Sequence, residues 1–244
     1  MKILVCIANV PDTTAKINFT PDNKEFVSTG VTFILNPYDE IALSKAVDLT
    51  AGGGSVTVIN IGDASTEPTI RKALAIGASD AVRVNAKPRD GYFVAKQIAE
   101  YVKKNSFDLI LCGRESSDSN GSSVPAMVAE LLDIPCILFA KSLSIEGTTA
   151  TLEQEIEGGK EILSAPLPLV AGASEGMAEW KIPNMRGIMS ARTKPLSVIE
   201  PVDVPQYTQV QSFDKPVPRS SVKLIAAEDA GKLFDIIREE KKVI

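Results

Sequence analysis

The chain has 244 residues, 44% of them hydrophobic, which is enough for one large buried core with or without an appendage. Its 26 basic and 31 acidic residues give a net charge of −5, which excludes the broad basic surface of a nucleic-acid-binding protein. No apolar run approaches the roughly 20 residues that cross a bilayer, and the apolar start Lys2–Ala8 is too short for a signal peptide. We therefore expect a cytoplasmic protein without membrane insertion.

Strands and helices alternate along most of the chain. Short continuous apolar runs, typical of strands buried on both faces of a parallel sheet, occur at Lys2–Ala8, Val31–Leu35, Ser55–Ile61, Ala81–Val84, Phe107–Cys112 and Leu167–Ala171. Apolar residues at helical spacing follow from Pro37 to Leu49 and at Glu67–Ile76, Asp90–Lys104 and Val124–Leu132. This alternation predicts a doubly wound, mostly parallel, Rossmann-like α/β sheet, with Leu167–Ala171 as its last core strand.

The helix that begins at Pro37 has a clear start signal. Asn36 suits the N-cap position, and Pro37 suits the first helical position. The acidic pair Asp39-Glu40 falls in the first turn, where the helix dipole favours negative charge.

The pattern changes in the second half of the chain. Alternating residues at Leu143–Ile145 and Thr149–Ile156, with glycine turns beside them, predict an antiparallel edge ribbon. After about Ala178 prolines interrupt the chain, and helical spacing returns only at Ala227–Glu240. A disordered tail is one interpretation, but the apolar residues between positions 182 and 199 favour an extended arm that packs on another chain.

The sequence contains no histidine. This excludes Ser-His-Asp and Cys-His catalysis and removes the commonest metal ligand. Cys6, Cys112 and Cys136 stand singly among apolar residues, so we interpret them as buried strand thiols. We therefore predict no catalytic residue and no metal site, and we expect a binding or carrier protein.

The loop that begins at Gly113 carries the residues best suited to ligand binding. Gly113 and Gly121 allow tight turns and a close backbone approach. Ser122 and Ser123 offer hydroxyl and N–H groups at a helix N-terminus, where phosphate is favoured, and Asp118 could accept hydrogen bonds that hold the loop together. Any βα loop capped by serines has this pattern, so these residues alone leave phosphate binding and a purely structural loop equally open.

Several motifs, taken together and in order, resemble the β subunit of electron-transfer flavoproteins. They are Asn36-Pro37-Tyr38-Asp39-Glu40, Ile70-Arg71-Lys72-Ala73-Leu74-Ala75-Ile76-Gly77-Ala78, Gly113-Arg114 with Asp118, Leu167-Pro168, and Ile182-Pro183-Asn184-Met185-Arg186-Gly187-Ile188-Met189-Ser190-Ala191-Arg192. In that family the β subunit pairs with a larger α subunit that holds the redox FAD. The β subunit itself binds AMP as a structural ligand or, in bifurcating members, a second FAD.

The resemblance implies an adenine-nucleotide site in this chain. Its predicted cofactor-binding residues are Cys6, Asn36, Pro37, Tyr38, Asp39, Ile61, Ser116, Asp118, Asn120, Gly121, Ser122, Ser123 and Val124. Where the family commonly has Thr-x-Gln, this chain has Gly121-Ser122-Ser123. The missing glutamine removes one side-chain contact and leaves the choice between AMP and FAD open.

The resemblance also implies a surface for redox partners. The segment that starts at Ile182 corresponds to the family's recognition loop, where an exposed leucine anchors partner dehydrogenases, and Ile182, Pro183 and Met185 are the predicted partner-binding residues. Because a proline follows, the backbone of Ile182 is restricted to an extended form; packing of Ile182 under the arm is the alternative. The implied partners are acyl-CoA-type or other flavoprotein dehydrogenases and a quinone-linked oxidoreductase.

These expectations divide the chain into three parts. Residues 1–181 form the adenine-nucleotide-binding domain, and residues 182–200 form the recognition loop. Residues 201–244 form an arm that clasps the α subunit through Leu233, Phe234 and Ile237.

Two other protein classes share a broadly similar fold. A stand-alone ATP-binding domain of the universal-stress type would explain the glycine and serines at 121–123 but not the arm. An adenylating enzyme would need a Ser-Gly-Gly-x-Asp-Ser loop after its first strand, where this chain has Ala8-Asn9-Val10-Pro11-Asp12. We therefore predict an electron-carrier subunit.

Overall fold

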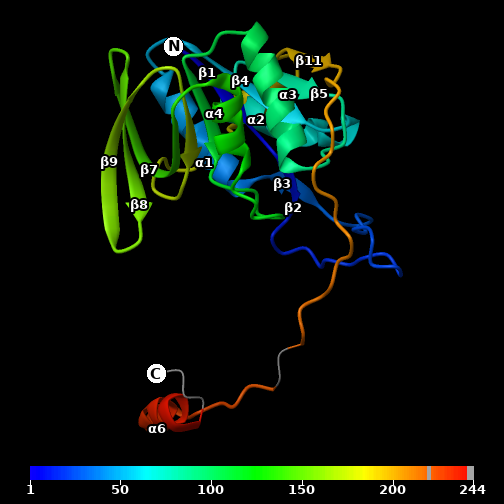
Figure 1. Ribbon diagram of the computed structural model, residues 1–244, viewed down its shortest axis with the longest axis vertical. Coiled ribbons are helices and arrows are strands. Elements are labelled where there is room, and N and C mark those ends of the chain that lie inside the picture. Colours follow the sequence, from blue (N-terminus) through cyan, green and yellow to red (C-terminus); the bar gives the residue numbers. More distant parts are fainter. Residues whose placement is uncertain (219–220, 241–244) are drawn as a thin grey trace.

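Residues 1–218 and 221–240 are described by the structure, a computed structural model drawn as a ribbon in Figure 1. Its strands are β1 (Lys2–Cys6), β2 (Asn9–Pro11), β3 (Phe33–Leu35), β4 (Ser55–Ile61), β5 (Asp80–Val84), β6 (Leu109–Gly113), β7 (Cys136–Glu146), β8 (Thr149–Ile156), β9 (Gly159–Pro166), β10 (Leu169–Ala173) and β11 (Leu196–Ile199). Its helices are α1 (Pro37–Leu49), α2 (Glu67–Ile76), α3 (Gly91–Lys104), α4 (Val124–Leu132), α5 (Met185–Ala191) and α6 (Ala230–Asp235). Single turns of 3₁₀ helix are η1 (Ala64–Thr66) and η2 (Ala227–Asp229), and η3 (Ile236–Glu240) is a turn of π-helix.

Within the described residues, nine strands form one sheet in the order β11-β5-β4-β1-β6-β10-β7-β8-β9. Neighbouring strands from β11 to β7 run parallel, and β7, β8 and β9 form an antiparallel ribbon at one edge. The chain passes from β1 to β4 and β5 on one side and then crosses to β6 on the other side of β1. The predicted doubly wound, mostly parallel sheet with an antiparallel edge ribbon is therefore confirmed.

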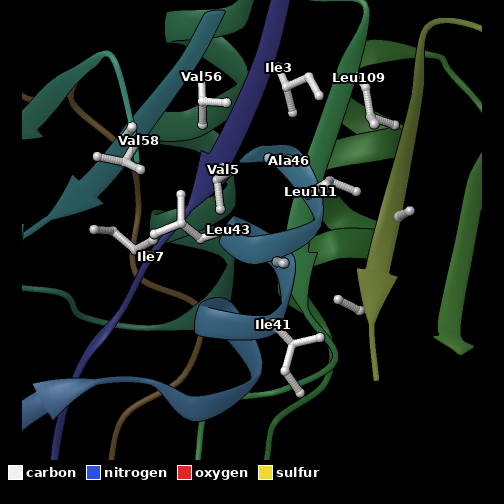
Figure 2. Packing of buried hydrophobic residues seen from close by; sticks show 14 of the residues in the cluster. Ile3, Val5, Ile7, Ile41, Leu43, Ala46, Val56, Val58, Leu109 and Leu111 are labelled. Atoms are coloured by element: carbon white, nitrogen blue, oxygen red, sulfur yellow. The ribbon is translucent and has the colours of Figure 1, made fainter. Parts of the chain in front are cut away.

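Helices cover both faces of this sheet. Ile3 and Val5 of β1 belong to the hydrophobic cluster that includes Leu43 of α1, as Figure 2 shows, and α2 and α5 contribute to the same cluster. Leu4 and Cys6 point to the opposite face, where α3 and α4 supply the second cluster. Each fully buried aliphatic side chain contributes roughly 1.5–3 kcal/mol to folding. The two clusters therefore fix β1 at the centre of the sheet.

Two differences from the sequence-based predictions concern the parallel part of the sheet and its start. The predicted core strand Val31–Leu35 is shorter, and it pairs with β2 in a separate two-stranded sheet because the chain turns into α1 at Pro37. The strand β10 is not the last one, since β11 adds to the edge of the sheet beside β5. The ammonium group of Lys194 holds this segment by donating to the carbonyls of Leu74 and Ala78 at 2.8 and 2.6 Å.

The predicted arm begins with a segment that packs on the chain's own domain. We call residues 201–215 the strap. The buried amide of Gln97 donates to the Val202 carbonyl at 2.9 Å and accepts from the Val202 N–H at 2.8 Å. The carboxylate of Asp90 accepts from the N–H groups of Tyr207 and Thr208 at 2.8 and 3.1 Å. Beyond the strap, the part with η2 and α6 is set apart from the rest of the chain in Figure 1.

Candidate functional site

The carboxyl ends of β1, β4 and β6 bring together most of the residues predicted to bind a nucleotide. Cys6 ends β1, Ile61 ends β4 and Gly113 ends β6. The strand connections reverse direction at β1, which lies between the other two. In open α/β sheets, ligands bind outside the carboxyl ends of the strands at such a reversal. We call these strand ends, together with the start of α1 and the loop 114–123, the strand-end site.

The site residues straddle the edge of the sheet. Tyr38 packs against the cluster on the α1 and α2 face. Cys6, Ile61 and Val124 belong to the cluster on the α3 and α4 face or pack against it. A ligand that touched all of them would therefore lie across the strand ends and not on one face.

Asn36 stands at the N-cap of α1, as predicted, but its side chain does not cap the helix. Its amide N–H group donates to the Glu115 carbonyl at 2.9 Å, and its amide oxygen accepts from the Ser117 N–H at 3.2 Å. The side chain is almost fully buried, so these bonds to the loop replace both solvent and the capping bond. Asn36 therefore fixes the loop that follows β6 to the start of α1.

Asp39 connects the ends of two neighbouring strands. One carboxylate oxygen accepts from the Ala8 N–H at 2.8 Å, just beyond β1, and the other accepts from the Gly113 N–H at 2.9 Å. Burial raises the pKa of Asp39 to about 7, against the hydrogen bonds from Ala8, Asn36 and Gly113, which lower it. A Cβ on Gly113 would lie 2.4 Å from the Asp39 carboxylate, so only glycine fits at this strand end.

The loop 114–123 is held by contacts that the sequence pattern did not indicate. The hydroxyl oxygens of Ser116 and Ser119 are 2.9 Å apart, and the Ser122 hydroxyl donates to the Glu115 carboxylate at 2.9 Å. Asp118, which we expected to hold the loop, is exposed and makes no side-chain hydrogen bond within the described residues. Glu115 takes that role because its carboxylate lies inside the loop, where Ser122 can reach it.

The N-terminus of α4 has the donors that a phosphate group requires. Ser123 is its N-cap residue and makes no side-chain capping bond, so the hydroxyl and the first N–H groups of the helix are available. The buried Ser117 hydroxyl also lacks a partner within the described residues. Pro125 removes one N–H group from this turn, and Glu115 adds negative charge that Arg114 partly offsets at 3.4 Å. The donor set therefore fits a phosphate group.

Arg114 was not among the predicted site residues. Its guanidinium lies 5.6 Å from the centre of the Tyr38 ring and 4.8 Å from that of Phe139. Phe139 has a φ of 53°, at the irregularity where the pairing of β7 with β10 shifts. The sequence shows the arginine directly after a strand end, but nothing in it indicates the two aromatic neighbours.

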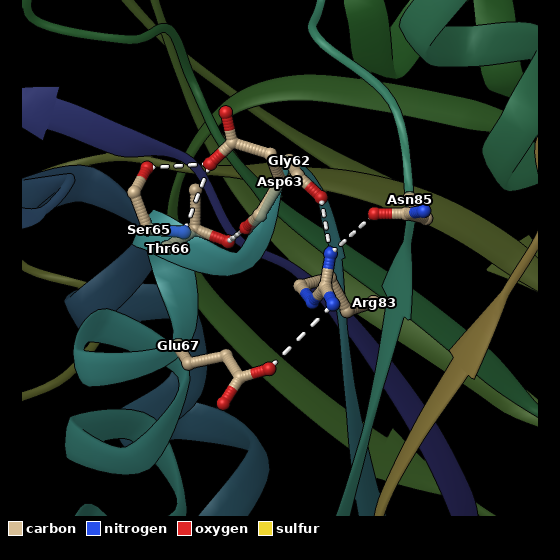
Figure 3. A network of polar contacts seen from close by, with 7 residues as sticks. All are labelled: Gly62, Asp63, Ser65, Thr66, Glu67, Arg83 and Asn85. Carbon is tan, nitrogen blue, oxygen red and sulfur yellow. Dashed lines mark hydrogen bonds and ion pairs between the residues drawn. The ribbon is translucent and has the colours of Figure 1, made fainter.

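A second arginine fixes the turn that follows Ile61 (Figure 3). Arg83 is buried in β5 and donates to the Gly62 carbonyl at 3.0 Å and to the Asn85 side chain at 2.9 Å. Its guanidinium also lies 3.5 Å from the Glu67 carboxylate at the start of α2. Because Arg83 reaches both the turn and the helix, it determines how the chain leaves β4 beside the strand-end site.

Cys6 and Cys112 are buried near the ends of β1 and β6, as predicted, whereas Cys136 at the start of β7 lies away from the site and is only half-buried. A hydrogen bond with the Cys6 thiol is the larger cause, and burial the smaller one, that holds the pKa of Cys112 well above its usual range. Burial raises the pKa of Cys136 to about 11. Neither residue is therefore an activated nucleophile. Across residues 1–218 and 221–240 no cluster of three or more His, Cys, Asp or Glu side chains could hold a metal ion.

The predicted partner-binding segment is exposed. The Ile182 side chain is 90% accessible, so it is not packed under the arm in this chain, and Met185 and Met189 are also exposed. Pro183, which lies between Ile182 and Met185, is half-buried. Exposed apolar side chains gathered in one short segment are typical of a surface that binds another protein.

Comparisons with known proteins agree with this arrangement. The model of the electron transfer flavoprotein domain matches residues 24–204. The electron transfer flavoprotein subunit beta of Bacillus subtilis is 34% identical over 260 residues, which cover 100% of both chains. The human subunit beta is 33% identical over 251 residues and 98% of both chains, and that of Thermoanaerobacterium thermosaccharolyticum is 31% identical over 244 residues, 96% of this chain and 92% of its own.

None of the helices in the described ranges is long and apolar enough to cross a membrane.

The family match covers most of the chain, and the relatives match over nearly their whole length. Of the three protein classes considered from the sequence, this match supports the electron-transfer flavoprotein subunit over the universal-stress type domain and the adenylating enzyme. The chain belongs to the electron transfer flavoprotein family, and the relatives that it matches are β subunits.

Proposed function

We propose that this chain is the small subunit of a heterodimeric electron-transfer flavoprotein and that it binds one adenine nucleotide at the strand-end site. Electrons would pass through the FAD of a larger α subunit, while this chain supplies a docking surface for dehydrogenases. In this role the chain is a carrier subunit and not a classical enzyme.

The observation that carries the nucleotide proposal is the convergence at the strand ends. Cys6, the Asn36–Asp39 turn, Ile61 and the loop 114–123 come from separate parts of the sequence, yet they meet where the strand connections reverse. The first turn of α4 offers N–H groups for a phosphate, and Ser123 and Ser117 add hydroxyl groups without partners in the described residues. This donor set supports a phosphate-bearing ligand.

AMP and FAD share the adenosine and phosphate groups that this donor set suits. AMP would stabilise the fold and the heterodimer without redox chemistry, whereas a FAD would supply an additional electron carrier when bound. The residues of this chain would hold the phosphate and orient the adenosine in either case. We propose AMP as the occupant and a second FAD as the alternative for a bifurcating complex.

The docking proposal rests on the exposed segment that begins at Ile182. Its apolar side chains are accessible. Pro183 already restricts the backbone of Ile182 to extended conformations, so little conformational entropy would be lost when Ile182 binds a partner. Flavoprotein dehydrogenases, of the acyl-CoA type or another type, and a quinone-linked oxidoreductase are the proposed partners.

Release and counting of nucleotides tests this function. The chain is co-expressed with a candidate α subunit, the complex is purified and denatured, and the released nucleotides are separated by chromatography. We expect one FAD and one AMP per heterodimer, and two FAD would identify a bifurcating complex. FAD without any second nucleotide would contradict the proposed site, and failure to form a complex would contradict the subunit assignment.

A further inference from the structure

Asp39 lies at the point where the strand-end site is held together. Its two carboxylate oxygens accept from the Ala8 N–H at 2.8 Å and from the Gly113 N–H at 2.9 Å. Ala8 follows β1 and Gly113 ends β6, and these two strands are neighbours where the connections reverse. A single side chain therefore bridges the two strand ends between which the proposed nucleotide would bind.

The backbone around Asp39 is fixed from the same elements. The N–H group of Asn36 donates to the Ala8 carbonyl at 3.1 Å, so Ala8 is bonded to α1 through both of its backbone groups. Asn36 in turn bonds Glu115 and Ser117 of the loop. The carboxylate of Asp39 thus completes a set of bonds that joins β1, α1 and the loop after β6.

Burial decides how Asp39 can act. Its side chain is 5% exposed, and both carboxylate oxygens are already occupied by backbone N–H groups. Neither oxygen is left facing outward to bind a ligand. Asp39 was predicted from the family resemblance to touch the nucleotide, but this geometry assigns its influence to the backbone.

We infer that Asp39 is a positioning residue of the nucleotide site: its ionised carboxylate holds the ends of β1 and β6 at a fixed separation and thereby places the loop 114–123 for the phosphate. This inference rests on the proposed nucleotide-binding function and goes beyond it, because it names a residue that acts without touching the ligand. Protonation would replace one of its acceptors with an O–H group, which faces a backbone N–H, and the bridge would open on that side.

The surroundings of Asp39 place this change near neutral pH. Burial raises its pKa to about 7, and the charge of Asp118 raises it further. Other titratable or charged side chains at the same strand ends and loop are the Cys6 and Cys112 thiols and the Arg114–Glu115 pair. Tyr38 and Glu40 lie beside Asp39 on α1, and Glu40 pairs with Lys72 of α2. The carboxylate is therefore ionised above neutral pH and protonated below it.

Binding of AMP to the full-length chain, measured by calorimetry between pH 6 and pH 8, tests this inference. We expect Asp39→Asn to weaken binding about tenfold or more at pH 8, because one acceptor becomes an amide donor that faces an N–H group. The difference between the wild-type protein and this variant should shrink as the pH falls to 6. The AMP phosphate itself titrates near pH 6 and affects binding to both proteins equally. The affinity of Asp39→Asn at each pH is therefore the baseline from which the effect of Asp39 is measured.

Two further variants separate the possible causes. Gly113→Ala keeps the carboxylate but places a methyl group 2.4 Å from it, so it should weaken AMP binding in the same way. Asp108→Asn is the matched control, because the Asp108 carboxylate accepts from the Lys2 N–H at 2.7 Å and joins the same two strands at their opposite ends. It should leave the affinity for AMP unchanged.

Each contrary outcome overturns the inference for a stated reason. Tighter AMP binding by Asp39→Asn at pH 8 would show that the carboxylate acts on the ligand by charge. A loss of affinity that is equal at every pH, or equal in the Asp108 variant, would show a general effect on folding. If the wild-type chain binds no AMP, the proposed function fails, and amide hydrogen exchange still tests the bridge: the Ala8 and Gly113 amides should exchange faster in Asp39→Asn than in Asp108→Asn, and equal rates would refute it.

Discussion

Cutting the chain after Glu200 should destabilise the sheet domain itself, because the strap packs on that domain. The cut removes Val204, which is 3% exposed, and both partners of the buried Gln97 amide. It also removes Tyr207, whose ring lies 4.9 Å from that of Tyr92. The chain without residues 201–244 therefore loses contacts that belong to the fold and not only to a partner interface.

The expected loss follows from these contacts. Burial of one valine contributes roughly 1.5–3 kcal/mol, each unpaired polar group costs about 1–3 kcal/mol and the aromatic pair adds about 0.5–1.5 kcal/mol. Water can reach Gln97 once the strap is gone, so the lower ends of these ranges apply. We expect a loss of about 4 kcal/mol, a large part of the roughly 5–15 kcal/mol that stabilises a typical domain.

Urea unfolding followed by circular dichroism measures this loss. With a slope of about 2 kcal/mol per molar urea, the midpoint should fall by about 2 M. A chain cut after Pro218 keeps the strap and serves as the matched control, with a midpoint equal to that of the full chain. If the two truncated chains unfold at the same urea concentration, the strap does not stabilise the domain, and the arm from residue 201 onward serves a partner alone.

Three further predictions concern the site and the docking segment. Replacing Ser122 and Ser123 by glutamate should lower the AMP content of the purified complex at least tenfold by charge repulsion, and unchanged content after denaturing release would refute the phosphate position. Ile182→Ala should slow electron transfer from a dehydrogenase several-fold, with the melting temperature unchanged because the side chain is 90% exposed; equal rates would exclude an anchor. The pKa of Asp39 is raised from 3.8 to about 7, so the folded state binds its proton more tightly, and this contribution to stability should be lost as the pH rises from about 4 to about 7. Asp39→Asn should abolish that part of the pH dependence of unfolding.

Helices and strands with clear end signals could be predicted to the residue. The sequence predicts α2 at Glu67–Ile76, and the structure has the same bounds. Pro68 is tolerated only in the first turn, and Gly77 ends the helix with a φ of 157° where an added Cβ would lie 2.7 Å from Val47. The strand β4 is likewise bounded by Gly54 and Gly62. These ends depend on local sterics, which a sequence displays directly.

Elements that depend on distant partners were missed. The strand β11 has only four residues, Leu196–Ile199, and it lies in the proline-interrupted stretch whose apolar residues we assigned to an arm. It forms because Lys194 and Arg71 join it to the end of α2, and these bonds span more than a hundred residues of sequence. The strand β9 was missed because most of its side chains are exposed.

The candidate site shows the same division between local and distant signals. The glycines and serines of the loop could be selected from sequence because turn and cap chemistry uses few residue types, whereas the residues from Asn36 to Asp39 were assigned to the site through the family resemblance. Their partners could not, since the bond from Asp39 to Gly113 requires the strand order that places β6 beside β1. Sequence identifies which side chains have unusual chemistry, and only the topology identifies what they act on.

The same topology explains why one acidic residue matters more than its neighbours. Asp118 is exposed in the loop, and water screens its charge, so its effect on a bound phosphate is modest. Asp39 is buried beneath the same loop and bridges two strands, so a change of one proton alters backbone positions on both sides of the site. A site of this kind responds to pH through the separation of its strands, and the affinity for nucleotide should fall at the pH where the fold itself gains stability. That opposition distinguishes a positioning carboxylate from one that repels the phosphate, because direct repulsion between Asp39 and the phosphate would move both quantities in the same direction.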